Sequence, residues 1–266
     1  MKRIFRLIKT GSLDAYRNMA FDEAVFLESC RTGIPVLRIY GWQAPSVSIG
    51  CSQMYSFDWH IPATLPVVRR MTGGGLLVHG NEITYSLMCA QADFGLPSSI
   101  PQSYKAICSF LIRFYEGLGL NASFAIDAAD FSIRNKEGYT WCCASHEKYD
   151  ILIAGKKIGG NAQKRKGTFL FQHGSIPLRP VFEGPSFGNS VPSGCALSDL
   201  IEHVPPTDTL EDALADSFCR TFDVACDPDS LHADETALYE ELLEIKYKND
   251  DWNKFRKEPH KAPVVE

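Results

Sequence analysis

The chain has 266 residues, 45% of them hydrophobic, and a formal net charge of −5 at pH 7. This length and hydrophobic content allow a large buried core, which excludes a disordered or fibrous protein. The acidic balance excludes a broad nucleic-acid-binding surface, and the basic residues gather mainly at 156–166, a stretch suited to one anionic ligand or an acidic protein partner.

Nine cysteines form an odd set without a Cys-x-x-Cys pair, and no apolar stretch resembles a signal peptide or a membrane span. This pattern predicts a protein of the reducing cytoplasm, with no membrane contact. Cysteines in apolar runs, such as residues 106–114, are expected to be small buried hydrophobes.

The first half of the chain alternates β-rich runs with two helical patterns. Residues 1–8 predict a strand, and Gly11-Ser12 predicts the cap of a helix that reaches about residue 30 and ends at Gly33. A second helix is expected from Pro101 to about Gly117. Further strands are predicted at 36–40, 46–50, 65–70, 76–79 and 83–89, with two short ones within 121–139.

The second half begins with a predicted hairpin over 149–158, with its turn at Gly155-Lys156 and a break at Gly159-Gly160. A strand, a loop and two helices are then expected at 168–178, 181–194, 207–222 and 234–246. Because no repeat or second domain-sized unit is recognisable, we expect one domain over 1–200 and a helical C-terminal extension over 201–266 packed on it.

Three consecutive glycines, Gly73, Gly74 and Gly75, lie between two predicted strands. Glycines there cost backbone entropy, so they indicate positive φ or close approach of the backbone to a ligand, with a plain bulge or turn as the alternative. Arg69 and Arg70, just before them, suit a carboxylate, a phosphate or an acyl-adenylate. The spacing matches neither a Walker loop nor a dinucleotide fingerprint.

The strand after the glycines has one polar side, formed by Glu82, Thr84 and Ser86. Such a side suits either the wall of a site or solvent. Trp42 also has two interpretations, a pocket wall or a half-buried packing residue.

The stretch from Cys142 to Arg165 combines a candidate nucleophile, a basic side chain and a glycine pair. Cys142 and Cys143 precede the hairpin, and Lys157 is expected on the edge of its return strand. Cys142, Cys143 and His146 could also begin a metal site, but no further ligands cluster nearby, so none is predicted.

With RRMTGGGLLVHGNEITYS (69–86) and YDILIAGKKIGGNAQKR (149–165) both in view, the chain resembles the lipoate-attachment superfamily. This superfamily contains lipoate–protein ligases, octanoyltransferases and, more distantly, biotin–protein ligases. The resemblance covers about residues 3–178 and includes RIYGWQAPSVSIGCSQ (38–53) and FQHGSIPL (171–178), with KYKNDDWN (246–253) as a later match. It implies an α+β fold with a mixed, mainly antiparallel sheet flanked by helices. It also implies attachment of octanoyl or lipoyl groups to a lysine of a lipoyl domain or of glycine cleavage H protein.

Two chemistries divide the superfamily: ligases activate a free acid with ATP, whereas transferases take the acyl group from a thioester. In the cysteine-dependent octanoyltransferase branch, a cysteine precedes the strand whose lysine opens K-I-x-G-x-A-Q, and Cys142 stands at that place. Residues 148–150, Lys-Tyr-Asp, replace the R-N-D of common ligases, and residues 82–86 also resemble the cysteine branch. Two departures remain, because Gly75 is ligase-like and Cys143 replaces a phenylalanine.

The resemblance implies catalytic roles for Cys142 and Lys157, and substrate binding by Arg69, Arg70, Gly73, Gly74, Gly75, His79, Gly159 and Gly160. A thiolate attacks a thioester readily, and exchange between thioesters is nearly balanced in energy, so no cofactor is expected. Lys157 would lower the pKa of Cys142 or stabilise the developing oxyanion. The base that deprotonates the acceptor lysine stays open, with His79 preferred to His146.

We therefore predict an acyltransferase that moves an octanoyl or lipoyl group from an acyl carrier protein, through Cys142, to the acceptor lysine. Neither nucleic acid nor membrane is an expected partner. The first alternative is an ATP-dependent lipoate–protein ligase, which would need ATP and Mg²⁺. The second is a non-catalytic relative that binds lipoyl domains.

Overall fold

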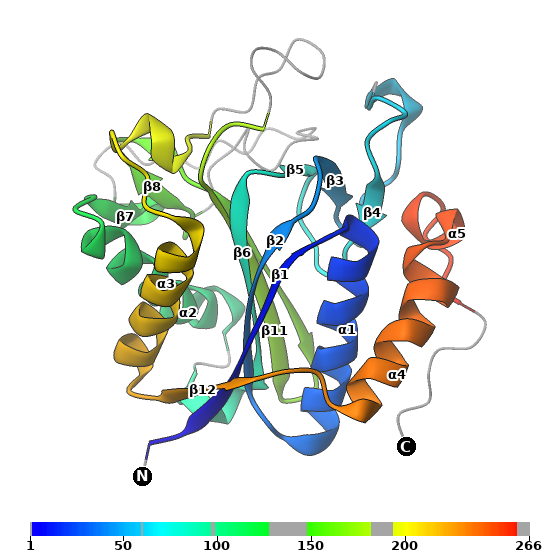
Figure 1. Cartoon of the computed structure of the whole chain (residues 1–266), viewed down its shortest axis with the longest axis horizontal. Coiled ribbons are helices and arrows are strands. Elements are labelled where there is room, and N and C mark those ends of the chain that lie inside the picture. The colour runs from blue at the N-terminus through cyan, green and yellow to red at the C-terminus, as the bar shows by residue number, and fades with distance from the viewer. Residues whose placement is uncertain (1, 60, 97–98, 128–147, 182–193, 260–266) are drawn as a thin grey trace.

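The computed structural model describes residues 2–59, 61–96, 99–127, 148–181 and 194–259. A six-stranded sheet forms its centre, with helices on both faces (Figure 1). In spatial order its strands are β10 (Gly160–Lys166), β11 (Phe169–Pro177), β6 (Glu82–Ala90), β2 (Val36–Trp42), β1 (Ile4–Leu13) and β12 (Ala225–Asp229). Neighbours run antiparallel from β10 to β2, whereas β2, β1 and β12 are parallel. The predicted α+β class with a mixed, mainly antiparallel sheet is confirmed.

Two smaller sheets flank the central one. The first contains β4 (Val67–Arg69), β3 (Ser46–Ile49) and β5 (Leu77–His79), with β3 in the middle. The second contains β7 (Ala122–Phe124), β8 (Ile151–Ile153) and β9 (Lys156–Lys157). The strands on either side of the three glycines, β4 and β5, therefore do not pair with each other, because β3 separates them.

The helices pack in two pairs, one on each face of the central sheet (Figure 1). One pair is α1 (Ala15–Thr32) with α4 (Ala233–Leu242), and the other is α2 (Ile100–Gly117) with α3 (Thr207–Phe222). A π turn (Leu243–Tyr247) and the short α5 (Asp250–Asn253) follow α4. Single 3-10 turns occur at Phe57–Trp59, Gln91–Phe94, Ala125–Asp127 and Leu197–Asp199.

Alternation along β6 separates two environments. Ile83, Tyr85 and Leu87 join the largest hydrophobic cluster, which includes α2 and α3. Thr84 and Ser86 point to the opposite face, where α1 packs. The polar side predicted from the sequence therefore faces the interior between the sheet and α1.

Most predicted elements are present, with shifted ends. The α1 cap is Asp14, whose side chain accepts from Arg17 N at 2.9 Å, because β1 continues to Leu13 and displaces the predicted start at Gly11-Ser12. Gly33 ends α1 with φ 75°, as predicted. The β8–β9 hairpin forms, but its positive-φ turn residues are Ala154 and Gly155, one position earlier than predicted.

The sequence analysis did not predict β10 and β12. Both are edge strands, and neither shows the regular apolar alternation of a half-buried strand. Within 121–139 the structure contains β7, while residues 128–139 lie outside the described part. The predicted loop at 181–194 also lies almost wholly outside it.

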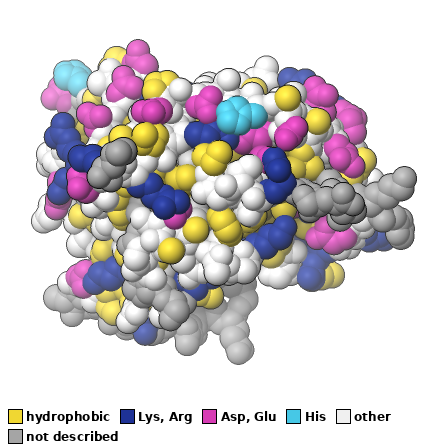
Figure 2. Space-filling view, turned by 90° about the horizontal axis from the view of Figure 1, so that it is seen from below, with side chains coloured by type: hydrophobic (Ala, Val, Ile, Leu, Met, Phe, Trp, Pro, Cys, Tyr) yellow, Lys and Arg dark blue, Asp and Glu magenta, His cyan; other side chains and the backbone are white. Residues whose placement is uncertain are grey.

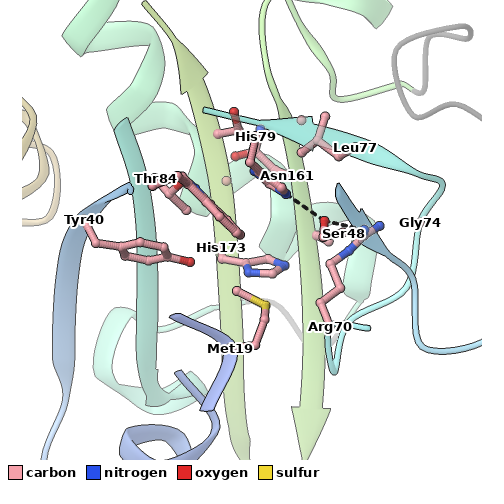
Figure 3. Close-up of a pocket in the computed structure, with 15 residues that line it drawn as sticks. Met19, Tyr40, Ser48, Arg70, Gly74, Leu77, His79, Thr84, Asn161 and His173 are labelled. Carbon is pink, nitrogen blue, oxygen red and sulfur yellow. Dashed lines mark hydrogen bonds between the residues drawn. The ribbon is translucent and has the colours of Figure 1, made fainter. Parts of the chain in front are cut away.

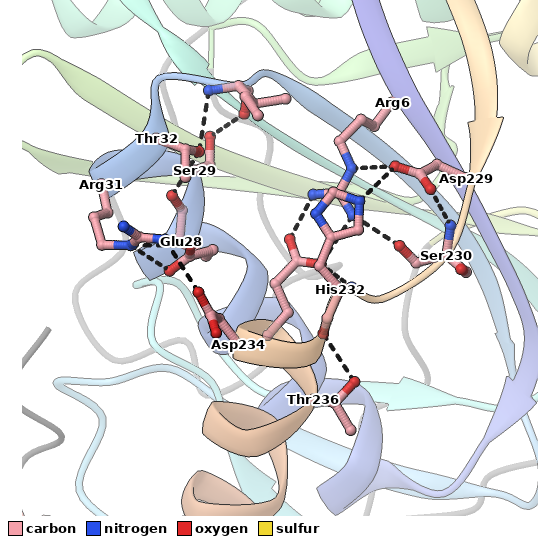
Figure 4. A network of polar contacts seen from close by, with 12 residues as sticks. Arg6, Glu28, Ser29, Arg31, Thr32, Asp229, Ser230, His232, Asp234 and Thr236 are labelled. Carbon is pink, nitrogen blue, oxygen red and sulfur yellow. Dashed lines mark hydrogen bonds and ion pairs between the residues drawn. The ribbon is translucent and has the colours of Figure 1, made fainter.

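The region after residue 200 shares the central sheet through β12. Arg6 of β1 donates to the carboxylates of Asp229 and Glu235 and to Ser230 O (Figure 4). On the α1 side, Arg31 pairs with Glu28 and Asp234. These contacts tie β1, β12, α1 and α4 together, so this region contributes a strand as well as helices.

Charges of both signs are interspersed on the face shown in Figure 2, without a continuous basic field. Among the described residues, no helix is both long and apolar enough to cross a membrane.

Candidate active site

A cavity lies between α1, the central sheet and the β3–β4–β5 sheet (Figure 3). Its lining includes the apolar or aromatic side chains Met19, Tyr40, Trp42 and Leu77 and the polar side chains Ser48, Arg70, His79, Asn161 and His173. Such a lining is typical of small-ligand pockets. An apolar wall with a few polar groups suits an acyl chain that ends in a polar carbonyl.

The glycine loop, residues 72–75, forms one edge of this cavity through Gly74, whose φ is +94°. Arg70 folds back over the loop, and its Nη2 donates to Gly73 O at 2.8 Å and to Gly75 O at 2.7 Å. A Cβ on Gly50 would lie 2.1 Å from Gly74 O. The predicted positive φ is therefore present at Gly74, and the backbones of Gly50 and Gly74 lie close together. Gly73 lines a second, separate pocket.

His79 forms part of the wall, stacked on Trp42 with ring centroids 3.7 Å apart. Its Nδ1 lies 2.9 Å from Glu82 Oε1 and its Nε2 lies 2.7 Å from Ser48 Oγ. Ser48 Oγ also accepts from Arg70 Nη1 at 3.0 Å. Both ring nitrogens are engaged, so His79 would have to release Ser48 before its Nε2 could accept a proton from a substrate.

The polar side of β6 contributes to the same wall. Thr84 lines the cavity, accepts from Trp42 Nε1 at 2.8 Å and donates to Glu82 Oε1 at 2.7 Å. Trp42 is only 6% exposed and lines the cavity. Of the two roles predicted for it, the structure therefore supports the pocket wall over the half-buried packing residue.

A buried ionic network centred on Asp22 lies beneath the cavity. Asp22 accepts from Arg38 Nη1 at 2.7 Å, from Tyr40 Oη at 2.9 Å and from Ser86 Oγ at 2.8 Å. Burial alone would raise the pKa of Asp22, but Arg38 and His173 outweigh it and the pKa is lowered. The Arg38 guanidinium also lies over the Tyr40 ring, 3.8 Å from its centroid. This network holds Tyr40 at the cavity wall.

His173 connects this network to the glycine loop. Its Nε2 lies 2.7 Å from Thr72 Oγ1, and its Nδ1 lies 3.8 Å from Asp22 Oδ2. Burial lowers the pKa of His173, although Asp22 partly opposes the shift. The hydroxyl of Thr72 is therefore the hydrogen-bond partner of His173 on the side of the glycine loop.

Lys157 is 3% exposed, and its Nζ lies 2.7 Å from Asp150 Oδ2. Gly159 has φ +68°, and a Cβ there would lie 1.9 Å from Ser175 O, so only glycine fits between β9 and β10. Gly160 follows and lines the cavity. The hairpin that carries Lys157 therefore leads within three residues to the cavity wall.

Arg69 occupies a different place from Arg70. Its guanidinium is fully buried and donates to backbone carbonyls, including Gly50 O at 2.8 Å and Gln53 O at 2.6 Å. Burial lowers the pKa of Arg69 to about 10, with Arg256 adding to the shift. Arg69 is not among the residues that line the cavity.

The remaining predicted residues cannot be placed. Cys142, Cys143 and His146 all lie outside the described residues. Within the described part, no group of three or more His, Cys, Asp or Glu side chains is arranged to hold a metal ion.

Several lining residues were not singled out from the sequence. Asn161 accepts from Tyr85 Oη at 2.8 Å, and Gly174 gives it room, because a Cβ there would lie 1.9 Å from Asn161 Oδ1. Asn161 lies in the N-A-Q run that carries the family resemblance, so a signal for it existed. Ser48 likewise lies in the 38–53 stretch that carries the resemblance. Met19, and Asp22 beneath the cavity, had no local signal, because their surroundings come from distant parts of the chain.

Two solved structures resemble the chain over nearly its whole length. One is a bipartite lipoate protein ligase of Thermoplasma acidophilum, with TM-score 0.76, 19% identity and coverage of 98% of this chain and 100% of that one. The other is a lipoate-protein ligase A bound with ATP, with TM-score 0.74, 22% identity and coverage of 97% and 100%. At these identities the likeness establishes the fold.

Residues 14–184 match the family described as Lipoyl protein ligase A/B catalytic domain, and the chain belongs to this family. Among its relatives, octanoyltransferase LipM of Kyrpidia tusciae is 33% identical, covering 94% of this chain and 98% of that protein. The LipM of Bacillus subtilis is 29% identical, covering 95% and 98%, and that of Staphylococcus aureus is 29% identical, covering 97% and 100%. The predicted superfamily is confirmed.

Proposed function

We propose that this chain transfers an octanoyl group from an acyl-carrier-protein thioester to the acceptor lysine of a lipoyl domain or glycine cleavage H protein, through a Cys142 acyl-enzyme. The observation that carries this proposal is the cavity with an apolar wall, bordered by Gly74 on one side and by Gly160 and Asn161 on the other. An eight-carbon chain would lie against Met19 and Leu77, with its carbonyl toward the polar residues.

The near-full-length match to curated octanoyltransferases bears out the predicted acyltransferase and does not favour the ATP-dependent ligase. For the proposed route no cofactor is required, because one thioester is exchanged for another. ATP and Mg²⁺ belong to the ligase alternative.

The first step would form a bond between the Cys142 thiolate and the thioester carbonyl carbon. The carbonyl electrons move to oxygen and return as the carrier thiolate leaves and takes up a proton. Lys157 would supply a positive charge for the oxyanion. Its ion pair with Asp150 accounts for the burial of this ammonium group, because a buried charge without a partner would be costly. In the second step the neutral acceptor amine attacks the Cys142 acyl group, which forms an amide and restores the thiol.

We further propose a cytoplasmic location. The seven described cysteines are all free thiols, which supports a reducing compartment.

The test is to incubate the protein with octanoyl acyl carrier protein in the absence of ATP and to measure intact mass. We expect an octanoyl adduct that hydroxylamine removes, that passes to an added lipoyl domain, and that is lost in Cys142→Ser. Cys143→Ser is the matched control and should keep the adduct. ATP-dependent modification by free lipoate, without any adduct, would overturn the proposal. Full transfer by Cys142→Ser would overturn the assignment of the nucleophile.

A further inference from the structure

The C-terminal residues 252–253 hold Arg69 by its backbone and its side chain. Asn253 Oδ1 accepts from Arg69 N at 2.9 Å, and Trp252 Nε1 donates to Arg69 O at 2.9 Å. Arg69 Nε in turn donates to Trp252 O at 2.9 Å. Three hydrogen bonds therefore join one residue of β4 to two residues that lie more than 180 positions later in the chain.

We propose that Trp252 and Asn253 are positioning residues, which set the glycine loop through Arg69 and thereby decide which acyl chains fit the cavity. This inference rests on the proposed function, because it concerns the same cavity. It assigns a role to the KYKNDDWN stretch, which lies outside the matched family region of residues 14–184.

The segment that carries these two residues is itself firmly attached to α1. Lys246 Nζ donates to Glu23 Oε1 at 3.0 Å, and Tyr247 Oη donates to Glu23 Oε2 at 2.6 Å. Lys246 Nζ also lies 4.0 Å from the centroid of a Trp252 ring, and Asn253 Nδ2 donates to Tyr247 O at 2.7 Å. Because Lys246, Tyr247 and Asn253 are at most 5% exposed, the segment is a buried anchor.

Arg69 is connected to the cavity edge both along the chain and through space. Along the chain, the next residue is Arg70, which lines the cavity and donates to Gly73 O and Gly75 O. Through space, Arg69 Nη1 donates to Gly50 O at 2.8 Å, and the Gly50 backbone packs directly against Gly74 O. A movement of Arg69 would therefore displace Gly74 through Arg70 and through Gly50. The Gly50 and Gly74 backbones are in direct contact, so no side chain can rotate to absorb the movement.

A merely structural role for the segment makes a different prediction. Lower global stability reduces the folded fraction, so it scales the transfer of every donor by the same factor. It also speeds exchange throughout the structure at the amides that open only on global unfolding, with no preference for the glycine loop. A displaced cavity edge changes the relative rates of donors with different chain lengths, because a pocket discriminates single methylenes by its shape. It also loosens the glycine loop selectively.

The test uses Asn253→Ala, which removes the bonds to Arg69 and Tyr247, and Trp252→Phe, which removes one donor and keeps an aromatic ring. Ser217→Ala is the matched control, because it removes a buried 2.6 Å bond to Phe110 O between α3 and α2, on the far side of the sheet. The first measurement is amide hydrogen exchange of residues 69–76, followed by mass spectrometry. The second is the ratio of kcat/KM for octanoyl against hexanoyl and decanoyl carrier proteins.

We expect exchange within residues 69–76 to be on the order of 10-fold faster in Asn253→Ala, with a smaller increase in Trp252→Phe and none in Ser217→Ala. The octanoyl-to-hexanoyl ratio should fall by about threefold or more in the first two variants only. Equal exchange in Asn253→Ala and Ser217→Ala, or unchanged ratios, would overturn the inference. The exchange measurement needs no activity, so absence of an octanoyl adduct in the unmodified protein would refute the proposed function separately.

Discussion

Gly74→Ala should damage both stability and acyl transfer, whereas Gly73→Ala should leave stability nearly unchanged. Gly74 has φ +94°, and an added Cβ would lie 2.8 Å from Arg70 Nη2, which already binds two carbonyls of the loop. Alanine in such a conformation costs about 1–3 kcal/mol. At Gly73 no atom lies within 4 Å of the added Cβ and φ is not positive, so a change within about 0.5 kcal/mol is expected.

Both variants can be measured by urea unfolding, by thermal unfolding and by the initial rate of octanoyl transfer to a lipoyl domain. For a chain of this size, Gly74→Ala should lower the melting temperature by roughly 3–10 °C. The transfer rate should fall further than the loss of folded protein explains, because Gly74 is part of the cavity edge. Equal effects at both positions would refute the reasoning, since it depends on a difference in backbone conformation between adjacent glycines.

Three further perturbations follow from the same geometry. Asp22→Ala leaves the Arg38 charge buried without its carboxylate and should cost about 3–5 kcal/mol in urea unfolding. Gly50→Ala places a Cβ 2.1 Å from Gly74 O and should cost about 1–3 kcal/mol, with reduced octanoyl transfer. Burial lowers the pKa of His173, so below about pH 6.5 the unfolded chain takes up a proton at this residue and the folded chain does not, which destabilises the fold. His173→Gln removes this group, so its stability should fall less as the pH is lowered.

Each of these perturbations has a control or a contradicting result. Arg17→Ala breaks a partly exposed pair with Asp14 and should cost less than about 1 kcal/mol, so a cost equal to that of Asp22→Ala would contradict the buried-pair argument. Gly117→Ala has open space around its Cβ, and destabilisation equal to that of Gly50→Ala would remove the steric explanation. An unchanged pH profile in His173→Gln would show that His173 is not the titrating group.

Most of the helices and strands could be predicted from the sequence, because the residues that start, stop or pattern them lie within the elements or next to them. Pro101, Gly33 and the apolar spacing of α2 act within a few residues of the elements that they delimit. The edge strands β10 and β12 were missed for the opposite reason. Their polar residues form a strand only because β11 and β1 supply hydrogen-bonding partners.

The candidate site was only partly predictable. Gly74, His79 and Gly160 stand in recognisable motifs, and the structure brings them to one cavity. Asp22 lies in α1, and its burial depends on Arg38, which β2 places beside it from 16 positions away. No local pattern encodes such a pair.

The sequence by itself indicated the family, because its motifs resemble those of the lipoate-attachment superfamily, and it favoured thioester transfer over ligation. Only the tertiary structure decided what the two adjacent arginines do. Successive residues of an extended chain point to opposite sides, so Arg70 faces the cavity while Arg69 is directed to the buried carbonyls of the 50–53 turn and the C-terminal segment. Their identical chemistry gave no indication of which one would border the acyl site.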